Sequence, residues 1–166
     1  LGSSYVISDL LAALLYAQLQ RLDEITQARR EVWWRYYHQM AGLEAKELII
    51  RPGLEPHSEH NGHIYAFRVT GNAQGASGRR DAVLDYLRRH GVEATFHFVP
   101  LHSSPYGQKC LGYKKGDFPI TERVSTSLIR LPLYPELSAK QVDCVLNVLE
   151  DALKYAAETA CKFFRR

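Results

Sequence analysis

The sequence predicts an α+β fold, in which a small, largely antiparallel sheet is covered by helices. Three observations carry this prediction. The helical segments are amphipathic, the strand segments are short, and the elements follow in the order helix, strand, strand, helix, strand, helix, helix. The chain has 166 residues, of which 46% are hydrophobic and 23% are charged, which is ordinary for one domain with its own core.

A long helical pattern opens the chain. Ser8 is suited to cap the first turn, and Asp9 suits the positive end of the helix dipole. The pattern continues to about Met40, with a bend expected near residues 22–23 and a stop at Gly42. Leucines recur at helical spacing along its first half: Leu11, Leu14, Leu15, Leu19 and Leu22.

Aromatic side chains lie on more than one face of the second half of this pattern. We expect some of them, Trp33 and Trp34 above all, to pair with another domain or a second subunit. Because the chain begins with Leu1 and not with Met, we expect it to be a fragment of a larger protein. Residues 1–45 are then a helical segment leading to a large domain outside the chain, and residues 46–166 form the α+β small domain.

The middle of the chain alternates strands and loops. A short strand is expected at residues 48–50, a polar loop at 54–62 and an alternating strand at 63–70. A flexible loop at 71–78 then leads to a helix at about 79–90, which Gly91 ends. The next strand, residues 92–99, stops at Pro100, which cannot donate to a ladder.

The last third is predicted to be mostly helical. An irregular stretch follows His102, and Pro119 suits the first turn of a helix running to about Leu128. Residues 131–135 are extended because the position before a proline avoids the helical region. Ser138 and Gln141 form a capping box that starts the final helix.

Composition excludes several classes of partner. The net charge of +3 is too small for a nucleic-acid-binding surface, and no apolar run is long enough to cross a membrane. The three cysteines (Cys110, Cys144 and Cys161) are an odd number without metal-type spacing. We interpret them as free thiols of a reducing cytoplasm, with a disulfide framework as the alternative.

Two histidines mark the strongest candidate site. His97 and His102 stand on either side of the break that Pro100 makes in the predicted strand. Imidazoles at a strand end can bind or relay protons, although a histidine in such a place can equally be a satisfied structural side chain. No paired carboxylates stand near them in the sequence.

Other polar clusters are weaker. His57, His60 and His63 are spaced by three, but they cross a loop that does not aim them together, so we interpret them as solvated and predict no metal site. His63 differs because it opens a strand. Ser3 and Ser4 precede a helix N-terminus, where an anion such as phosphate is favoured and where caps are also common.

Several segments together resemble the C-terminal part of DegT/StrS-type nucleotide-sugar aminotransferases. The resemblance runs in the correct order from Gly2 to about Leu153. It is carried by Gly2 to Ala13, Ala17-Gln18-Leu19, Arg21-Leu22-Asp23, His63-Ile64-Tyr65, Phe96 to His102, Gly112 to Pro119, and Leu131 to Pro135.

This resemblance implies the small domain of a fold-type-I enzyme that uses pyridoxal 5'-phosphate and acts as a homodimer. Such an enzyme moves an amino group, from glutamate as donor, to a 4-keto-6-deoxy nucleotide sugar, with a TDP-linked sugar favoured. The cofactor is then bound mainly by the large domain, which also carries the Schiff-base lysine. This segment alone would contain no catalytic residue and would be inactive.

The resemblance also implies roles for single residues. Ser4, with Ser3, stands where the family often has an asparagine that reaches the cofactor phosphate of the partner subunit. His97, His102, Phe98 and His63 match positions near the substrate, and Phe98 replaces a frequent tyrosine. A non-catalytic regulatory or binding protein with the same fold remains the alternative, because fold alone does not determine function.

Overall fold

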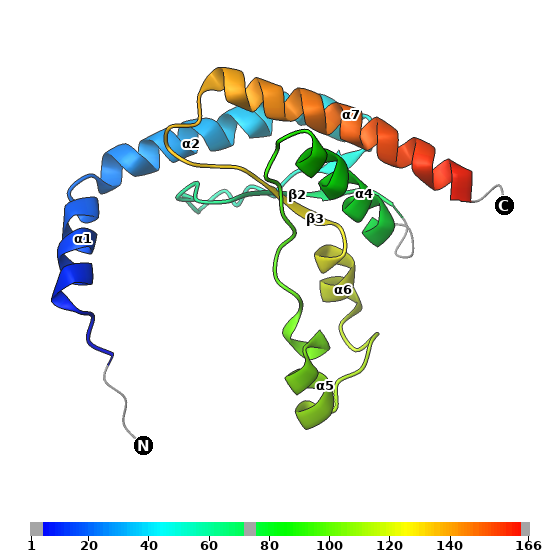
Figure 1. The fold of residues 1–166 in the computed structure, drawn as a ribbon, viewed down its shortest axis with the longest axis horizontal. Helices are drawn as coiled ribbons and strands as arrows, with labels where there is room; N and C mark the ends of the chain where they lie inside the picture. The colour runs from blue at the N-terminus through cyan, green and yellow to red at the C-terminus, as the bar shows by residue number, and fades with distance from the viewer. Residues whose placement is uncertain (1–4, 72–75, 164–166) are drawn as a thin grey trace.

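The structure is a computed structural model that describes residues 5–71 and 76–163. A three-stranded antiparallel sheet in the order β1-β2-β3 lies under helices on one face (Figure 1). The strands are β1 (Ile49–Ile50), β2 (Tyr65–Val69) and β3 (Leu128–Leu131). Among the described residues, the α+β prediction with a small antiparallel sheet is confirmed.

Three helices cover the sheet. The helix α2 (Leu22–Gln39) lies beside α7 (Ala139–Phe163), and α4 (Ala76–Arg89) packs against α7 (Figure 1). Alternation in β2 sends Tyr65, Phe67 and Val69 into this core and leaves Ala66 and Arg68 on the open face. This alternation confirms the alternating strand predicted within residues 63–70.

The predicted bend in the opening helix is confirmed. The helix α1 (Asp9–Leu19) ends one turn before α2 begins, and Ser8 Oγ accepts from the backbone N–H of Leu11 at 3.4 Å. The stop predicted at Gly42 is wrong, because Gly42 lies inside a short helix, α3 (Ala41–Ala45). The chain turns instead at Glu47, whose φ is 56°.

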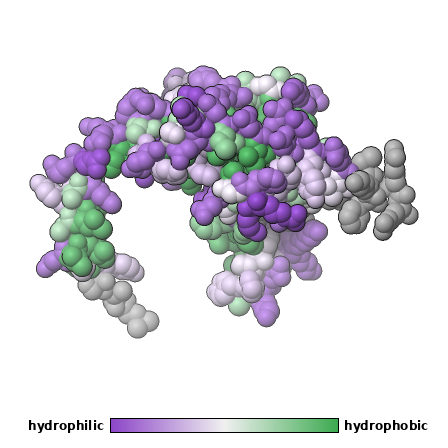
Figure 2. Space-filling view, turned by 45° about the horizontal axis from the view of Figure 1, so that its top comes forward, coloured by the Kyte–Doolittle hydropathy of each residue, from purple (hydrophilic) through white to green (hydrophobic). Residues whose placement is uncertain are grey.

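The expectation that Trp33 pairs with another domain or subunit is wrong, whereas Trp34 and Tyr37 are only partly buried and for them it stays a prediction. Trp33 is only 5% exposed and Tyr36 is fully buried in the chain's own core. Exposed apolar side chains gather on α1, which has no buried residue within the described part of the chain. Figure 2 shows this apolar surface along α1, at the end of the molecule opposite the C-terminal end of α7. Its largest side chains are Leu10, Leu11, Leu14, Leu15, Tyr16 and Leu19.

The third strand is not the one expected. Residues 92–99 form only a single bridge between Thr95 and Arg130, and the ladder partner of β2 is β3. The helix predicted to reach Leu128 is α6 (Pro119–Ser125), which ends three residues earlier. The reason is local: the hydroxyls of Thr126 and Ser127 donate to carbonyls of the last turn of α6 and end the helix before the strand.

Besides α3, the helix α5 (Pro105–Leu111) was not expected. It follows a 3-10 turn around His102, η1 (Leu101–Ser103). Its signals are present in the sequence. Ser104 caps the first turn by accepting from Gly107 N–H at 3.0 Å, Pro105 stands at the first helical position, and Gly112 ends the helix with φ 72°.

The remaining helix predictions are confirmed. Gly91 follows α4 with φ 77°, and Ser138 and Gln141 form the capping box of α7. Cys110 and Cys144 are free and exposed, while the side chain of Cys161 lies outside the description. Within residues 5–71 and 76–163, none of the helices combines the length and the apolar character that crossing a bilayer requires.

Candidate functional site

The segment 96–101 forms an exposed wall that leaves the edge of the sheet. Thr95 exchanges two backbone hydrogen bonds with Arg130, at 3.1 and 2.7 Å, and no ladder follows. Phe98 is then 77% exposed and Leu101 is 87% exposed. Pro100 has no N–H to donate, so the segment cannot continue as a strand. Large apolar side chains held in the open at such a place indicate a binding surface.

A groove of about 610 Å³ lies on one side of this wall. The wall contributes its aromatic and apolar side chains, and α6 forms the opposite bank. The groove is therefore mostly apolar, with His97 as its titratable group. Its lining comprises His97, Phe98, Val99, Pro100, Leu101, Ile120, Thr121, Val124, Ser125 and Leu128.

A second hollow of about 380 Å³ shares Phe98, Val99, Pro100 and Ser125 with the groove, so the wall separates the two. This hollow is more polar and contains both signs of charge. Its additional lining residues are Arg80, Phe96, Ser103, Gln108, Lys115, Glu122 and Thr126.

Arg80 joins α4 to the end of α6. Its Nη1 donates to the carbonyl of Ser125 at 2.8 Å, and its Nε and Nη2 donate to Asp81 at 2.9 and 2.7 Å. Its guanidinium carbon lies 5.8 Å from the ring centre of Phe96. These contacts hold a cation at the rim of the smaller hollow in one orientation.

His102 lies behind the wall and lines neither hollow. It is 8% exposed, and its Nε2 lies 3.2 Å from Oε1 of Glu122. The same carboxylate oxygen accepts from the backbone N–H of Gly116 at 2.7 Å. The Gly116 hydrogen bond, followed by the one from His102, lowers the pKa of Glu122. His102 therefore braces the wall to α6.

His97 and Phe98 are brought together on the groove. His97 is exposed, and its ring centre lies 4.9 Å from that of Phe98. Of the residues predicted from the sequence, these two face the groove. Ser3 and Ser4 lie outside the described residues, and His63 lies elsewhere.

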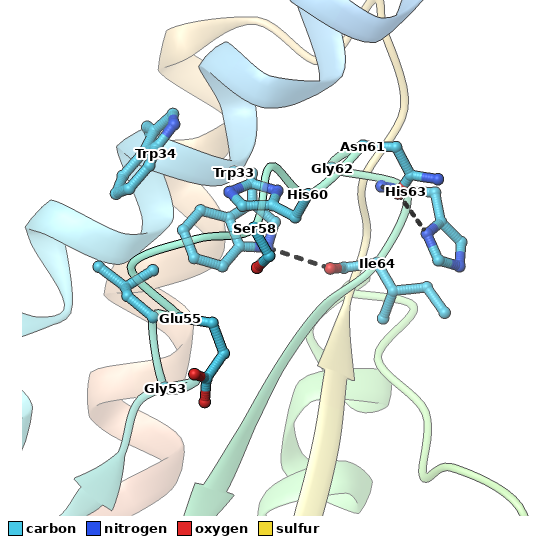
Figure 3. A pocket seen from close by; sticks show the side chains of 11 residues that line it. Trp33, Trp34, Gly53, Glu55, Ser58, His60, Asn61, Gly62, His63 and Ile64 are labelled. Carbon is cyan, nitrogen blue, oxygen red and sulfur yellow. Dashed lines mark hydrogen bonds between the residues drawn. The ribbon is translucent and has the colours of Figure 1, made fainter.

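His63 stands at the mouth of a third hollow of about 310 Å³, which the loop before β2 forms against α2 (Figure 3). Its Nδ1 is 2.8 Å from Oδ1 of Asn61. Trp33, at the back of this hollow, donates from Nε1 to the carbonyl of Ile64 at 3.1 Å.

His60 is not the solvated loop histidine that the sequence suggested. Its ring lies 4.0 Å from Trp33 and 5.6 Å from Trp34, and both ring nitrogens are buried without a hydrogen-bond partner in the structure (Figure 3). Burial, and then the nearby Arg30, lowers its pKa. His57 is exposed, and the described residues hold no group of three or more side chains that could ligate a metal.

Sequence reasoning missed Arg80 and Glu122. Arg79 and Arg80 stand near the start of α4, where the helix dipole disfavours positive charge, and that mismatch is a signal of another role. Glu122 stands in the first turn of α6, where a carboxylate is favoured for helix stability alone, so nothing local marks it.

The known proteins that resemble this chain are longer, and the chain matches only a part of each. The spore coat polysaccharide biosynthesis protein SpsC of Bacillus subtilis is 34% identical over 151 residues, which are 89% of this chain and 37% of that protein. The aminotransferase TlmJ of Streptoalloteichus hindustanus has a TM-score of 0.73 and 29% identity, covering 93% of this chain and 38% of that one.

A sugar aminotransferase of Streptococcus pneumoniae, Spr1654, shares the fold with a TM-score of 0.79 at 24% identity, over 93% of this chain and 37% of that one. The chain thus spans little more than a third of the length of these relatives. The family model of the DegT/DnrJ/EryC1/StrS aminotransferases matches residues 1–150. With nearly the whole chain matched, this protein belongs to the DegT/DnrJ/EryC1/StrS aminotransferase family.

Proposed function

We propose that this chain forms the small domain of a pyridoxal phosphate-dependent aminotransferase that acts on a nucleotide sugar, with glutamate as the amino donor. The observation that carries the proposal is the wall at 96–101 with a hollow on each side, in a chain of this family. Relatives described as a sugar aminotransferase and as a polysaccharide biosynthesis protein support the choice of a sugar substrate.

The two hollows suit the two halves of a nucleotide sugar. The apolar groove offers Phe98 and His97 to the ring of a deoxysugar. The smaller hollow offers Arg80 and Lys115, whose charges suit a diphosphate. His102 acts through Glu122 by holding the wall in place and does not itself touch the ligand in this proposal.

The described residues do not form a complete pocket for pyridoxal phosphate. Such a pocket needs a sheltered lysine, whereas every lysine whose side chain the structure describes is exposed and, of these, only Lys115 lines either hollow beside the wall. When bound, the cofactor supplies the chemistry of amino transfer. In this proposal, it is held mainly by residues outside this chain, and the wall orients the sugar nucleotide toward it.

Further assignments belong to the same proposal. Ser3 and Ser4 contact the cofactor phosphate, His63 contacts the substrate, and the enzyme is a cytoplasmic homodimer. Residues 1–45 lead to the large domain and residues 46–166 form the small domain. The exposed leucines of α1 support the assignment of residues 1–45 as a segment that leads to a large domain, because so much apolar surface requires a covering partner.

We further propose a TDP-linked 4-keto-6-deoxy sugar as substrate, for surface-polysaccharide biosynthesis. Within the family, the Ser3-Ser4 pair and the Phe96-His97 segment most resemble enzymes that make TDP-4-amino-4,6-dideoxygalactose.

The test is to incubate the full-length protein with pyridoxal phosphate, glutamate and a panel of 4-keto and 3-keto sugar nucleotides. We expect a yellow protein, an aminated TDP-sugar, and a KM for the sugar nucleotide at least about tenfold higher in His97→Ala. His57→Ala, at an exposed histidine outside both hollows, is the matched control.

Two outcomes would contradict the proposal. A colourless protein that aminates no sugar would favour a non-catalytic relative of this family. If the KM and kcat for the sugar nucleotide were unchanged in both His97→Ala and His102→Ala, the wall would not bind the substrate.

A further inference from the structure

A fourth hollow, of about 350 Å³, lies where β2 ends beside the last turn of α6. Arg68 and Arg123 line it, together with Thr70 and Ser127. Arg68 lies on the face of β2 opposite the core-facing Tyr65, Phe67 and Val69, and Thr70 directly follows the strand. Arg123 reaches the same hollow from α6. A strand and a helix thus bring two guanidinium groups to one small volume.

Neither guanidinium has a carboxylate to neutralise it. The residues beside Arg68 on the neighbouring strands are Ile50 and Leu128, which are apolar. Within the described part of the chain, the guanidinium groups of Arg68 and Arg123 form no ion pair and donate no hydrogen bond. In contrast, Arg51, directly after β1, pairs with Glu44 at 2.7 Å.

Arg79 does not line the hollow but contacts one of its lining residues, Thr70. Its Nη1 donates to the carbonyl and to Oγ1 of Thr70, at 2.9 and 3.1 Å. Its Nε is buried without a partner, and burial lowers its pKa with no carboxylate to oppose that shift. Arg68 and Arg123 in the hollow, with Arg79 bound to Thr70 beside it, give this place a positive field that an anion would lower.

We propose that Arg68 and Arg123 bind the phosphoryl group of a phosphorylated small molecule in this hollow, with Arg79 strengthening the positive field behind it. A dianion neutralises three cations better than a carboxylate does. A tetrahedral phosphoryl group also presents oxygens to both a strand and a helix, whereas a carboxylate offers one coplanar pair.

The two hydroxyl groups in the hollow donate to backbone carbonyls, so the arginines are the donors for the phosphoryl group. Ser127 Oγ donates to the carbonyl of Arg123 at 2.9 Å, and Thr70 Oγ1 donates to the carbonyl of Glu47 at 2.6 Å. Both hydroxyl protons are therefore used inside the fold. The volume exceeds that of a phosphate ion, which leaves room for the group that carries the phosphate.

The experiment is equilibrium dialysis of the full-length protein against radiolabelled inorganic phosphate at constant ionic strength, without cofactor or sugar nucleotide. We expect Arg68→Gln and Arg123→Gln each to weaken binding about tenfold or more, and the double variant to lose one bound phosphate per chain. Arg88→Gln removes the same charge from an exposed position on α4 and is expected to leave binding within about twofold of the wild type.

Competition identifies the ligand chemistry. Pyrophosphate and a sugar monophosphate are expected to displace from the wild type the one phosphate that the double variant does not bind. Glutarate is not expected to displace it. Equal phosphate binding in the two variants and in the control would overturn the proposal, as would preferential binding of glutarate. Since no amino transfer is measured, failure here is distinct from failure of the proposed aminotransferase activity.

Discussion

His102 donates from Nε2 to Glu122, at 3.2 Å, across 20 residues of sequence. Because an ionised carboxylate can only accept, and Glu122 also accepts from Gly116 N–H at 2.7 Å, the imidazole must be the donor. This contact ties the end of the exposed wall to α6. It therefore fixes the position of the wall relative to α6, the opposite bank of the groove that we assign to the sugar nucleotide.

Removing the charge of Glu122 should loosen the wall. Glu122→Gln keeps the shape of the side chain but loses the charge-assisted bonds, so we expect a lower thermal midpoint at pH 7. The pKa of Glu122 is below its usual 4.5 in the folded protein, so its stabilisation is present above pH 4.5 and is lost as the pH falls through the lower folded value. Thermal melts from pH 7 to pH 3 should therefore converge for the two proteins. A constant difference across that range would contradict this.

Gly107 is required where α5 contacts η1. A Cβ at this position would lie 2.4 Å from the carbonyl oxygen of Leu101, which is backbone and cannot move aside cheaply. We expect Gly107→Ala to destabilise the protein by about 1–3 kcal/mol in denaturant unfolding. Gly42→Ala is the control: it lies in α3 with nothing within 4 Å and should be neutral or stabilising by about 0.5–1 kcal/mol. Equal effects of the two changes would exclude the close contact as the cause.

His60 should make the loop before β2 sensitive to acid. Its pKa is below the usual 6.5 because the ring is buried, so the neutral ring stabilises the fold above pH 6.5 and this contribution is lost as the pH falls. Trp33 and Trp34 are the only tryptophans of the chain and both contact His60, so their emission reports on the loop. We expect a red shift on acidification below pH 6.5.

The matched variants separate this effect from general acid unfolding. His60→Phe keeps an aromatic ring against Trp33 and should abolish the shift. His57→Gln changes an exposed histidine of the same loop and should retain it. A shift that persists in His60→Phe would assign the titration to another group.

The leucines of α1 should be covered in the assembled protein. Leu11, Leu14 and Leu15 are each about half exposed, and burying one such side chain contributes about 1.5–3 kcal/mol. We expect Leu15→Glu to weaken dimerisation or to lower the stability of the full-length protein, measured by sedimentation equilibrium and thermal unfolding. Gln20→Glu, at the end of the same helix, is the control. A Leu15→Glu protein that matches this control would show that the face remains in solvent.

Local signals predicted much of the fold. Ser8, Gly91 and the Ser138–Gln141 pair mark helix ends through contacts between residues only a few positions apart, and all three behave as expected. The alternating burial of β2 also follows from one strand's own pattern. The prediction of the third strand was wrong because residues 92–99 and 128–131 both favour extended backbone, and only pairing with β2 distinguishes them.

The candidate site divides in the same way. The sequence by itself determined the α+β class, the family and the choice of residues 96–102 as a candidate site, because these depend on residue order and on short-range chemistry. Only the tertiary structure decided that His97 faces the groove while His102 lies behind it, and that Arg80, Glu122, Arg68 and Arg123 belong to hollows. The physical reason is that a side chain's partners are fixed by which elements pack together, and those elements lie tens of residues apart in the chain.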